Sequence, residues 1–383
     1  MKCLHICNDF TGSKVHLNLY KKLEDLDLEQ VIYNPIKSSS LPKFESRKSE
    51  LNSIALKSKS LTLKHRIFYK KKIKFLYEDL LENIDVNKLS IVHATTLFSD
   101  GGVAYQLYKE FNIPYIVAIR GTDINLFLKY RVDLYNIGYN IINNAQHIVF
   151  ISRSLEKNFF ESYFAKKYRI PKVKALVIAN GVDEFWLNNL SNQRQITKPS
   201  KFLYIGQFNY NKNILPLIKS FLKLSEKYNG ITLSLVGGGG KFEDEIKDLV
   251  KKNPNNLKYY GAVYDKKELL KIYRSHDIFT MISLSETFGL VYIEALTQGL
   301  PILFTKNQGI DGTFKDKIGL AINPKSENSM INGLEYMIKN YNNFEINKID
   351  FSKFIWKDIA KQYLELYTQV EQNSNLPLNI NRS

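Results

Sequence analysis

The chain has 383 residues, 44% of them hydrophobic and 24% charged, which is enough for one or two globular domains with a substantial core. No apolar run approaches the roughly 20 residues that a membrane-spanning helix needs, and the first residues enter a strand pattern without a secretory signal. Cys3 and Cys7 share one predicted strand, so we expect a reducing cytoplasm rather than a disulfide framework. No Cys/His cluster has zinc spacing.

Strand patterns alternate with amphipathic helix patterns over nearly the whole chain, which predicts βαβ units and parallel sheets. The Ser- and Lys-rich segment 37–59 is weakly periodic, so we expect a long loop there. The other elements predicted in the first half are strands at 3–7, 90–94, 115–119, 147–151 and 174–178, and helices at 15–26, 64–81, 103–111, 133–143 and 154–164.

The net charge of +16 is concentrated in the first half of the chain. Between Lys37 and Lys74 there are twelve lysines and arginines against two glutamates. The run 65–75 interleaves cations with aromatic and aliphatic residues, so it can lie on an anionic membrane or meet nucleic-acid phosphates. A solvated, lysine-rich helix face has the same pattern. No nucleic-acid module accompanies the charge, so no nucleic-acid partner is expected.

The second half repeats the architecture of the first without a sequence repeat. An α/β fold of two Rossmann-like, doubly wound parallel-sheet domains facing across a cleft is the simplest interpretation, and ligands of such sheets bind at the carboxyl ends of strands. The elements predicted in this half are strands at 202–205, 232–236, 257–260, 278–282 and 301–305, and helices at 213–227, 242–251, 266–276, 288–298, 327–340 and 354–367.

The segment 285–301, SETFGLVYIEALTQGLP, opens on a polar edge and then becomes almost wholly apolar. Glu294 lies inside the apolar run, and an ionised carboxylate there is costly unless hydrogen bonds are donated to it. Ribose hydroxyls are suitable donors, and the open N–H groups near Phe288 to Leu290 form a site for a diphosphate. The alternative is a core helix in which Glu294 pairs with a buried lysine or arginine.

With its Glu-x7-Glu spacing, this segment resembles the donor-site signature of family 4 glycosyltransferases, also called group 1 glycosyl transferases, which have the GT-B fold. The resemblance implies that Glu286 contacts the sugar and Glu294 the ribose of a nucleotide sugar. It also implies transfer with retention at the anomeric carbon, without a metal or other cofactor; the nucleotide sugar, UDP- or GDP-linked, is a substrate. The residues expected at the helix start are Thr287, Phe288, Gly289 and Leu290.

The resemblance extends to FLYIGQFNYNK, in which Lys212 keeps the place of a lysine that neutralises the donor diphosphate. Gly206 is followed by Gln207 where the family usually has arginine, so another cation is needed or Lys212 contributes more. The alternative interpretation is that Lys212 is a solvated loop lysine. In the glycine run 237–240, Gly238 and Gly239 are expected to line the nucleotide pocket, or to form a tight turn for packing. The polar loop 306–312 resembles a further donor loop.

Acceptor residues are expected in the first half. Thr11 and Gly12 follow the first strand, and His93 ends another, where a structural histidine is the commoner interpretation. In PYIVAIRGTDIN, Arg120 takes the place of a family histidine that contacts the transferred sugar. Arginine is no general base but binds phosphate or carboxylate in a bidentate manner, so we infer an acidic acceptor or an added clamp on the donor phosphates. Asp123 is an acceptor contact or a turn residue.

The predicted division is an acceptor-binding domain at 1–180 and a donor-binding domain at 181–353, with a helix at about 354–372 returning to the first. Glu286, Lys212 and Arg120 are the predicted catalytic residues. The predicted function is a hexosyltransferase acting on a glycan or lipid-linked acceptor in bacterial cell-surface polysaccharide synthesis, such as lipopolysaccharide or capsule. We expect it in the cytoplasm, peripheral at the inner face of the plasma membrane through residues 37–74. The alternatives are a nucleotide-sugar epimerase or phosphorylase on the same fold, or a non-catalytic lipid- or nucleic-acid-binding module.

Overall fold

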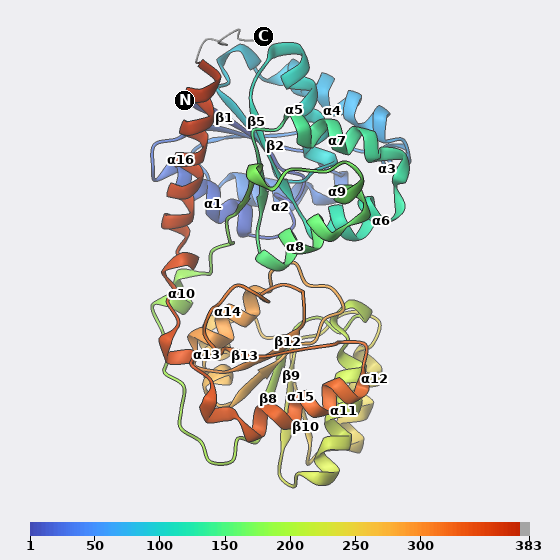
Figure 1. Cartoon of the computed structure of the whole chain (residues 1–383), viewed down its shortest axis with the longest axis vertical. Helices are drawn as coiled ribbons and strands as arrows, with labels where there is room; N and C mark the ends of the chain where they lie inside the picture. The colour runs from blue at the N-terminus through green and yellow to red at the C-terminus, as the bar shows by residue number, and fades with distance from the viewer. Residues whose placement is uncertain (376–383) are drawn as a thin grey trace. The chain divides into compact units, whose positions relative to one another are not determined.

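Strand pairing in the computed structural model, which describes residues 1–375, is parallel throughout, and it forms two separate sheets (Figure 1). Parallel strands are buried on both faces, which is why they read as continuous apolar runs in the sequence. The strand orders are β3-β2-β1-β4-β5-β6-β7 and β10-β9-β8-β11-β12-β13. Both orders grow outwards in two directions from a central strand, as in Rossmann-like sheets. This confirms the predicted α/β fold with two Rossmann-like parallel sheets.

The seven-stranded sheet comes from the first half of the chain. Its strands are β1 (Lys2–Ile6), β2 (Glu29–Asn34), β3 (Ile54–Lys57), β4 (Ile91–Ala94), β5 (Tyr115–Ile119), β6 (His147–Phe150) and β7 (Ala175–Val177). The helices of this half, with the last helix of the chain, are α1 (Val15–Glu24), α2 (Leu41–Lys48), α3 (Leu63–Ile67), α4 (Tyr69–Asn83), α5 (Ser99–Phe111), α6 (Leu128–Tyr130), α7 (Tyr135–Asn144), α8 (Arg153–Glu161), α9 (Tyr163–Lys167) and α16 (Trp356–Asn375).

The six-stranded sheet comes from the second half. Its strands are β8 (Lys201–Ile205), β9 (Thr232–Val236), β10 (Leu257–Gly261), β11 (Ile278–Thr280), β12 (Ile302–Thr305) and β13 (Gly319–Ile322). The helices are α10 (Glu184–Leu187), α11 (Ile214–Lys227), α12 (Glu243–Lys252), α13 (Lys266–Arg274), α14 (Leu290–Thr297) and α15 (Glu327–Lys339).

The chain divides into two units, each built around one sheet. The first unit comprises residues 1–151, 156–181 and the C-terminal residues from Trp356, and the second comprises residues 152–155 and 182–355. Helix α16 packs on α1 within the first unit (Figure 1).

Both faces of the first sheet are covered by helices. On β5, Ile116 and Ala118 belong to the core beneath α1 and α16, whereas Val117 points to the opposite face, close to Gly101 of α5. This alternation follows from the two-residue period of side chains along a strand. It leaves the carboxyl edge of the sheet, where the loops emerge, as the place for chemistry.

The structure corrects three sequence-based expectations. The segment 37–59 is no long loop, because it contains α2 and the edge strand β3. The single helix expected at 64–81 is divided at Phe68, whose backbone leaves the helical region with φ −94° and ψ 86°, into α3 and α4. Strands β2 and β13 were not predicted; β2, with six residues, lies next to the edge strand β3, and β13, with four, is itself an edge strand.

Candidate active site

The sheet of the second unit changes its direction of growth between β8 and β11, and ligands of open α/β sheets bind beside such a point. Lys212 lies in the loop after β8, and Glu286 in the loop after β11. Their side chains form an ion pair, with 2.7 Å between Lys212 Nζ and Glu286 Oε2, and are 23% and 14% exposed. The structure therefore brings two of the predicted catalytic residues together at the switch point. A lysine has three N–H donors, so the pair leaves Lys212 able to contact a further anion.

Backbone hydrogen bonds fix the position of Glu286. Its N–H donates to Gln308 Oε1 (3.2 Å), and its carbonyl accepts from the Gly309 N–H (2.8 Å), both from the predicted loop 306–312. Asn211 Nδ2 donates to the carbonyl of Ser285 (2.9 Å). The loops after β8, β11 and β12 are thus tied to one another around this carboxylate, which holds it in place for a bound molecule.

The start of α14 depends on Gly289. This residue has φ +82°, and a Cβ on it would lie 2.5 Å from the ring of Tyr292, so only glycine fits here. The N–H of Thr287 donates to Glu286 Oε1 (3.1 Å), and Phe288 is buried against Phe354. Leu290 is the first residue of the helix. The residues predicted for donor binding therefore form one turn that presents the first N–H groups of α14 beside Glu286.

Glu294, about one turn into α14, accepts a hydrogen bond from the hydroxyl of Tyr273 on α13 (3.1 Å). Burial raises the pKa of this carboxyl to about 7; the nearby carboxylate of Asp183 acts in the same direction, while the Tyr273 hydroxyl and Lys266 oppose it. Lys266 is itself paired with Asp183. Among the described residues no cation forms an ion pair with Glu294, so the alternative of a buried Glu–Lys or Glu–Arg pair does not hold. Tyr273 was not predicted.

The glycine run after β9 brings two strand ends close together. At Gly237 (φ +142°) a Cβ would lie 1.9 Å from the carbonyl oxygen of Gly206, so packing alone requires glycine there. The Gly239 N–H donates to Glu243 Oε2 (2.6 Å), while Gly238 has only ordinary contacts. Packing thus explains part of this run, and donor contacts by Gly238 and Gly239 stay a prediction.

Gln207 is exposed in the loop after β8. Its Oε1 accepts from Asn209 Nδ2 (3.2 Å), and its carbonyl accepts from the Tyr204 hydroxyl (2.9 Å). An amide at this position brings no charge toward a diphosphate. Lys212 is therefore the predicted donor-site cation that the structure places beside Glu286.

In the first unit the corresponding switch point lies between β1 and β4, and a network joins the loops there. Asn8 Nδ2 donates to Thr96 Oγ1 (3.2 Å), and Asp100 accepts from the hydroxyls of Thr95 and Thr96 (2.8 and 3.0 Å). Burial raises the pKa of Asp100 to about 7, against the effect of these hydroxyls. Asp100 was not predicted, because nothing in the sequence separates it from an ordinary residue at a helix start.

Arg120 and Arg47 lie near Asp9 at this edge. Burial raises the pKa of the Asp9 carboxyl, and the charges of both arginines oppose that rise. Arg120 Nε donates to the carbonyl of Thr95 (3.2 Å), and its terminal nitrogens have no hydrogen-bond partner within the part of the chain that the structure describes. Arg120 is therefore free to contact an anion.

Thr11 and Gly12 belong to the loop that Arg47 secures. The Arg47 guanidinium donates to the carbonyls of Phe10, Gly12 (3.1 Å) and Ser13 (2.6 Å). Sequence reasoning missed Arg47, which it placed in the loop expected at 37–59. The arginine fixes the shape of the turn in which the predicted acceptor residues lie.

Two predicted acceptor residues, His93 and Asp123, are buried inside the first unit. His93 is 1% exposed; its Nδ1 lies 2.7 Å from the Tyr367 hydroxyl, and its ring stacks on Tyr363, so α16 covers it. Asp123 is 1% exposed, and its carboxylate accepts the N–H groups of Arg120, Leu97 and Phe98. The Asp123 carboxylate is thus used by backbone N–H groups, and His93 Nε2 is buried without a hydrogen-bond partner. This burial favours structural roles for both residues, and their predicted contacts with an acceptor stay predictions.

Within residues 1–375, no group of three or more His, Cys, Asp or Glu side chains is arranged to hold a metal ion. Metal independence itself remains a prediction.

Comparison with known proteins agrees with this geometry. Residues 167–349, which include every strand of the second sheet, match the family model described as "Glycosyl transferases group 1". An uncharacterized glycosyltransferase of Methanocaldococcus jannaschii, MJ1607, is 24% identical over 312 residues, covering 76% of this chain and 78% of that protein.

Solved structures match over nearly the whole chain. Sucrose-phosphate synthase from Thermosynechococcus elongatus superposes with a TM-score of 0.71 at 17% identity, covering 97% of this chain and 100% of the other. The lipopolysaccharide outer core galactosyltransferase WaaB does so with a TM-score of 0.68 at 15% identity (98% and 99%). Anabaena HepE in complex with UDP also has a TM-score of 0.68 at 15% identity (96% and 100%).

The two Rossmann-like sheets and these likenesses define the fold as GT-B. The family match over the second half of the chain, with the M. jannaschii relative, further supports a glycosyltransferase.

Proposed function

We propose that this protein is a retaining, metal-independent glycosyltransferase that takes a hexose from a UDP- or GDP-sugar. The acceptor is an anionic, lipid-linked glycan of a bacterial cell-surface polysaccharide, and the enzyme works at the inner face of the plasma membrane. The second unit binds the donor and the first unit binds the acceptor.

One observation carries the donor assignment. The carboxylate of Glu294 lies in an apolar helix with a tyrosine hydroxyl as its hydrogen-bond partner, and burial raises its pKa to about 7. Ribose hydroxyls would donate to the ionised form and repay its desolvation. Glu286, on the same segment, is then placed toward the sugar.

The other groups of the donor site can stabilise the negative charge that develops as the bond between the sugar and the diphosphate breaks. When the sugar leaves, negative charge grows on the diphosphate, and fixed donors aimed at that charge lower the barrier. Lys212 and the first N–H groups of α14 are such donors, and Glu286 holds Lys212 by their 2.7 Å ion pair. Gln207 is uncharged and supplies no second cation here, so we assign the neutralisation of the diphosphate to Lys212.

Arg120 supports the anionic acceptor. Its Nε is fixed on the carbonyl of Thr95, while its terminal nitrogens have no partner among residues 1–375. A planar guanidinium held in this way matches a phosphate or carboxylate in a bidentate manner.

The surface of the first unit supports membrane attachment. Leu63, Ile67 and Phe68 around α3 are 75%, 67% and 51% exposed, and Lys71 lies 5.1 Å over the ring of Phe68. Apolar side chains flanked by lysines favour an anionic lipid surface. No helix within residues 1–375 is long and apolar enough to cross a membrane.

The test is a panel of UDP, GDP, ADP and their common sugars in thermal melts of the intact chain. A ligand at a hundred times its Kd adds about 2.7 kcal/mol to stability, which a melt resolves readily. Glu294→Gln and Lys212→Met should reduce both the shift and the transfer activity strongly, while Lys88→Met, on the surface of the first unit, should keep both. A wild-type chain that no nucleotide stabilises would refute the donor assignment. Isomerisation of a UDP-sugar without any acceptor would replace transfer by epimerisation.

A further inference from the structure

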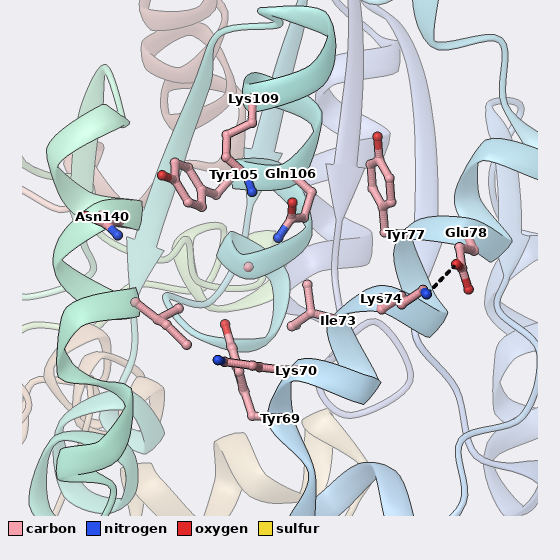
Figure 2. A pocket seen from close by; sticks show the side chains of 12 residues that line it. Tyr69, Lys70, Ile73, Lys74, Tyr77, Glu78, Tyr105, Gln106, Lys109 and Asn140 are labelled. Atoms are coloured by element: carbon pink, nitrogen blue, oxygen red, sulfur yellow. Dashed lines mark ion pairs between the residues drawn. The ribbon is translucent and has the colours of Figure 1, made fainter.

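A cavity of about 510 Å³ opens in the first unit between α4, α5 and α7 (Figure 2). This volume lies in the range of small-molecule sites. The lining residues come from different elements than those proposed to bind the donor or the acceptor. They are Tyr69, Lys70, Ile73, Lys74, Tyr77, Glu78, Gly102, Tyr105, Gln106, Lys109, Ile137 and Asn140.

The floor of the pocket is apolar, and two of the three tyrosine hydroxyls in its lining already have hydrogen-bond partners. The Tyr69 hydroxyl donates to the carbonyl of Phe98 (2.8 Å), and the Tyr77 hydroxyl donates to Glu110 Oε2 (2.6 Å). Ile73 and Ile137 line the pocket beside the ring of Tyr105. The surface of this floor is mostly carbon, so a hydrocarbon chain can be buried on it without losing hydrogen bonds to water.

Gly102 deepens this floor. A Cβ at Gly102 would lie 2.5 Å from the Tyr69 hydroxyl and 2.8 Å from Ile73 Cδ1, so the side chains of α4 lie directly on the backbone of α5.

The rim of the pocket is cationic. Lys70 and Lys74 come from α4 and Lys109 from α5, on two sides of the cavity (Figure 2). Lys74 lies 3.6 Å from Glu78, a weak and exposed pair, and Lys109 lies 5.3 Å over the ring of Tyr105. Three lysines against one glutamate in the lining give the rim a positive charge.

We propose that this pocket binds one anionic phospholipid, with an acyl chain on the apolar floor and the phosphate on Lys70, Lys74 and Lys109. Two observations select a membrane lipid over a soluble anion: the lining is apolar beneath the charged rim, and the exposed apolar residues Ile67 and Phe68 directly precede α4. The site does not depend on the proposed transferase activity. It adds a specific lipid contact to what would otherwise be general adsorption to charged membranes.

The test is isothermal titration of the intact chain with dihexanoylphosphatidylglycerol below its micelle concentration. We expect one site per chain, with much weaker binding of dihexanoylphosphatidylcholine and of glycerol 3-phosphate. Each lysine removed should weaken binding about fivefold, so Lys70→Met with Lys74→Met and Lys109→Met should weaken it roughly a hundredfold. The matched triple, with Lys88, Lys357 and Lys361 changed to Met, should stay within about twofold of wild type, because these lysines do not line the pocket.

A variant that fills the pocket distinguishes lipid binding inside the pocket from attraction of the lipid to the surrounding positive charge. Gln106→Trp should abolish binding of the short-chain lipid, while Asn143→Trp, on the exposed side of α7, should bind as wild type. Equal melting temperatures of the two variants establish that both are folded; if Gln106→Trp melts lower, Ile137→Trp takes its place. Unchanged binding by the filled pocket, or glycerol 3-phosphate binding as tightly as the lipid, would overturn the proposal.

Discussion

Glu294→Gln should raise the melting temperature of the chain at pH 8 and leave it nearly unchanged at pH 5. The pKa of this carboxyl is about 7 in the folded chain against an ordinary value of 4.5, with burial as the main cause. A group whose pKa is raised by folding contributes stability that is complete below pH 4.5 and is lost as the pH rises through 7. The ionised form therefore costs about 3 kcal/mol at pH 8, and a neutral glutamine of the same shape avoids most of that cost.

A gain of about 2–3 kcal/mol corresponds to roughly 4–12 °C in Tm for a unit of this size. The assay is differential scanning fluorimetry of the wild type and the variant across pH 5 to 8, because their difference cancels every other titrating group. Glutamine still accepts from the Tyr273 hydroxyl through its side-chain oxygen, so that bond is kept. A Tm difference that stays constant from pH 5 to 8 would refute the raised pKa and the reasoning built on it.

The same variant tests the ligand. Ribose hydroxyls donate to the ionised carboxylate, so the wild type should bind UDP or GDP about tenfold more weakly at pH 6 than at pH 8, and the variant should show no such dependence. At pH 8 the variant should bind roughly 10- to 100-fold more weakly than wild type, the usual cost of losing hydrogen bonds to a charged group. Greater stability together with weaker binding is a combination that a purely structural glutamate would not give.

Three further outcomes are expected. Lys212→Met leaves Glu286 without its cation and should lower transfer by about 10²- to 10³-fold, measured against Lys212→Arg, which keeps the charge. Gly289→Ala forces a Cβ to within 2.5 Å of the Tyr292 ring at φ +82° and should destabilise the second unit by about 1–3 kcal/mol in urea titrations; a neutral effect would contradict the described turn. His93→Phe should cost about 1 kcal/mol of stability through the lost bond to Tyr367 and leave the acceptor KM unchanged, since a raised KM with normal stability would restore His93 to the acceptor site.

The donor region was predictable because its signals are local. Each apolar strand is a short run of sequence, and so is the mixed polar and apolar start of α14. The structure places Glu286 and Lys212 2.7 Å apart, as expected for one site. What the sequence could not show is the partner of Glu294. Tyr273 lies on α13, and nothing in its local pattern points to a carboxylate two elements later.

The acceptor residues were harder for a related reason. His93 ends a strand whether it is an acceptor contact or a structural residue. The two interpretations differ in which face of the sheet its ring occupies and in what covers that face. That cover is α16, whose Tyr367 is 274 residues away from His93 in sequence, so no local pattern reveals it. Edge strand β3 was missed because its four residues, IALK, are too few for a clear alternation of buried and exposed positions.

The return of α16 has a consequence for how the protein is made. The second unit is almost wholly one continuous stretch of chain, whereas the first unit needs segments from both sides of that stretch. During synthesis, the second unit can complete its sheet while the α1 side of the first still exposes Tyr20 and Leu23, which α16 later helps to bury. Until then, the nascent polypeptide exposes apolar side chains on the incomplete N-terminal unit, and this is where a chaperone would be expected to bind.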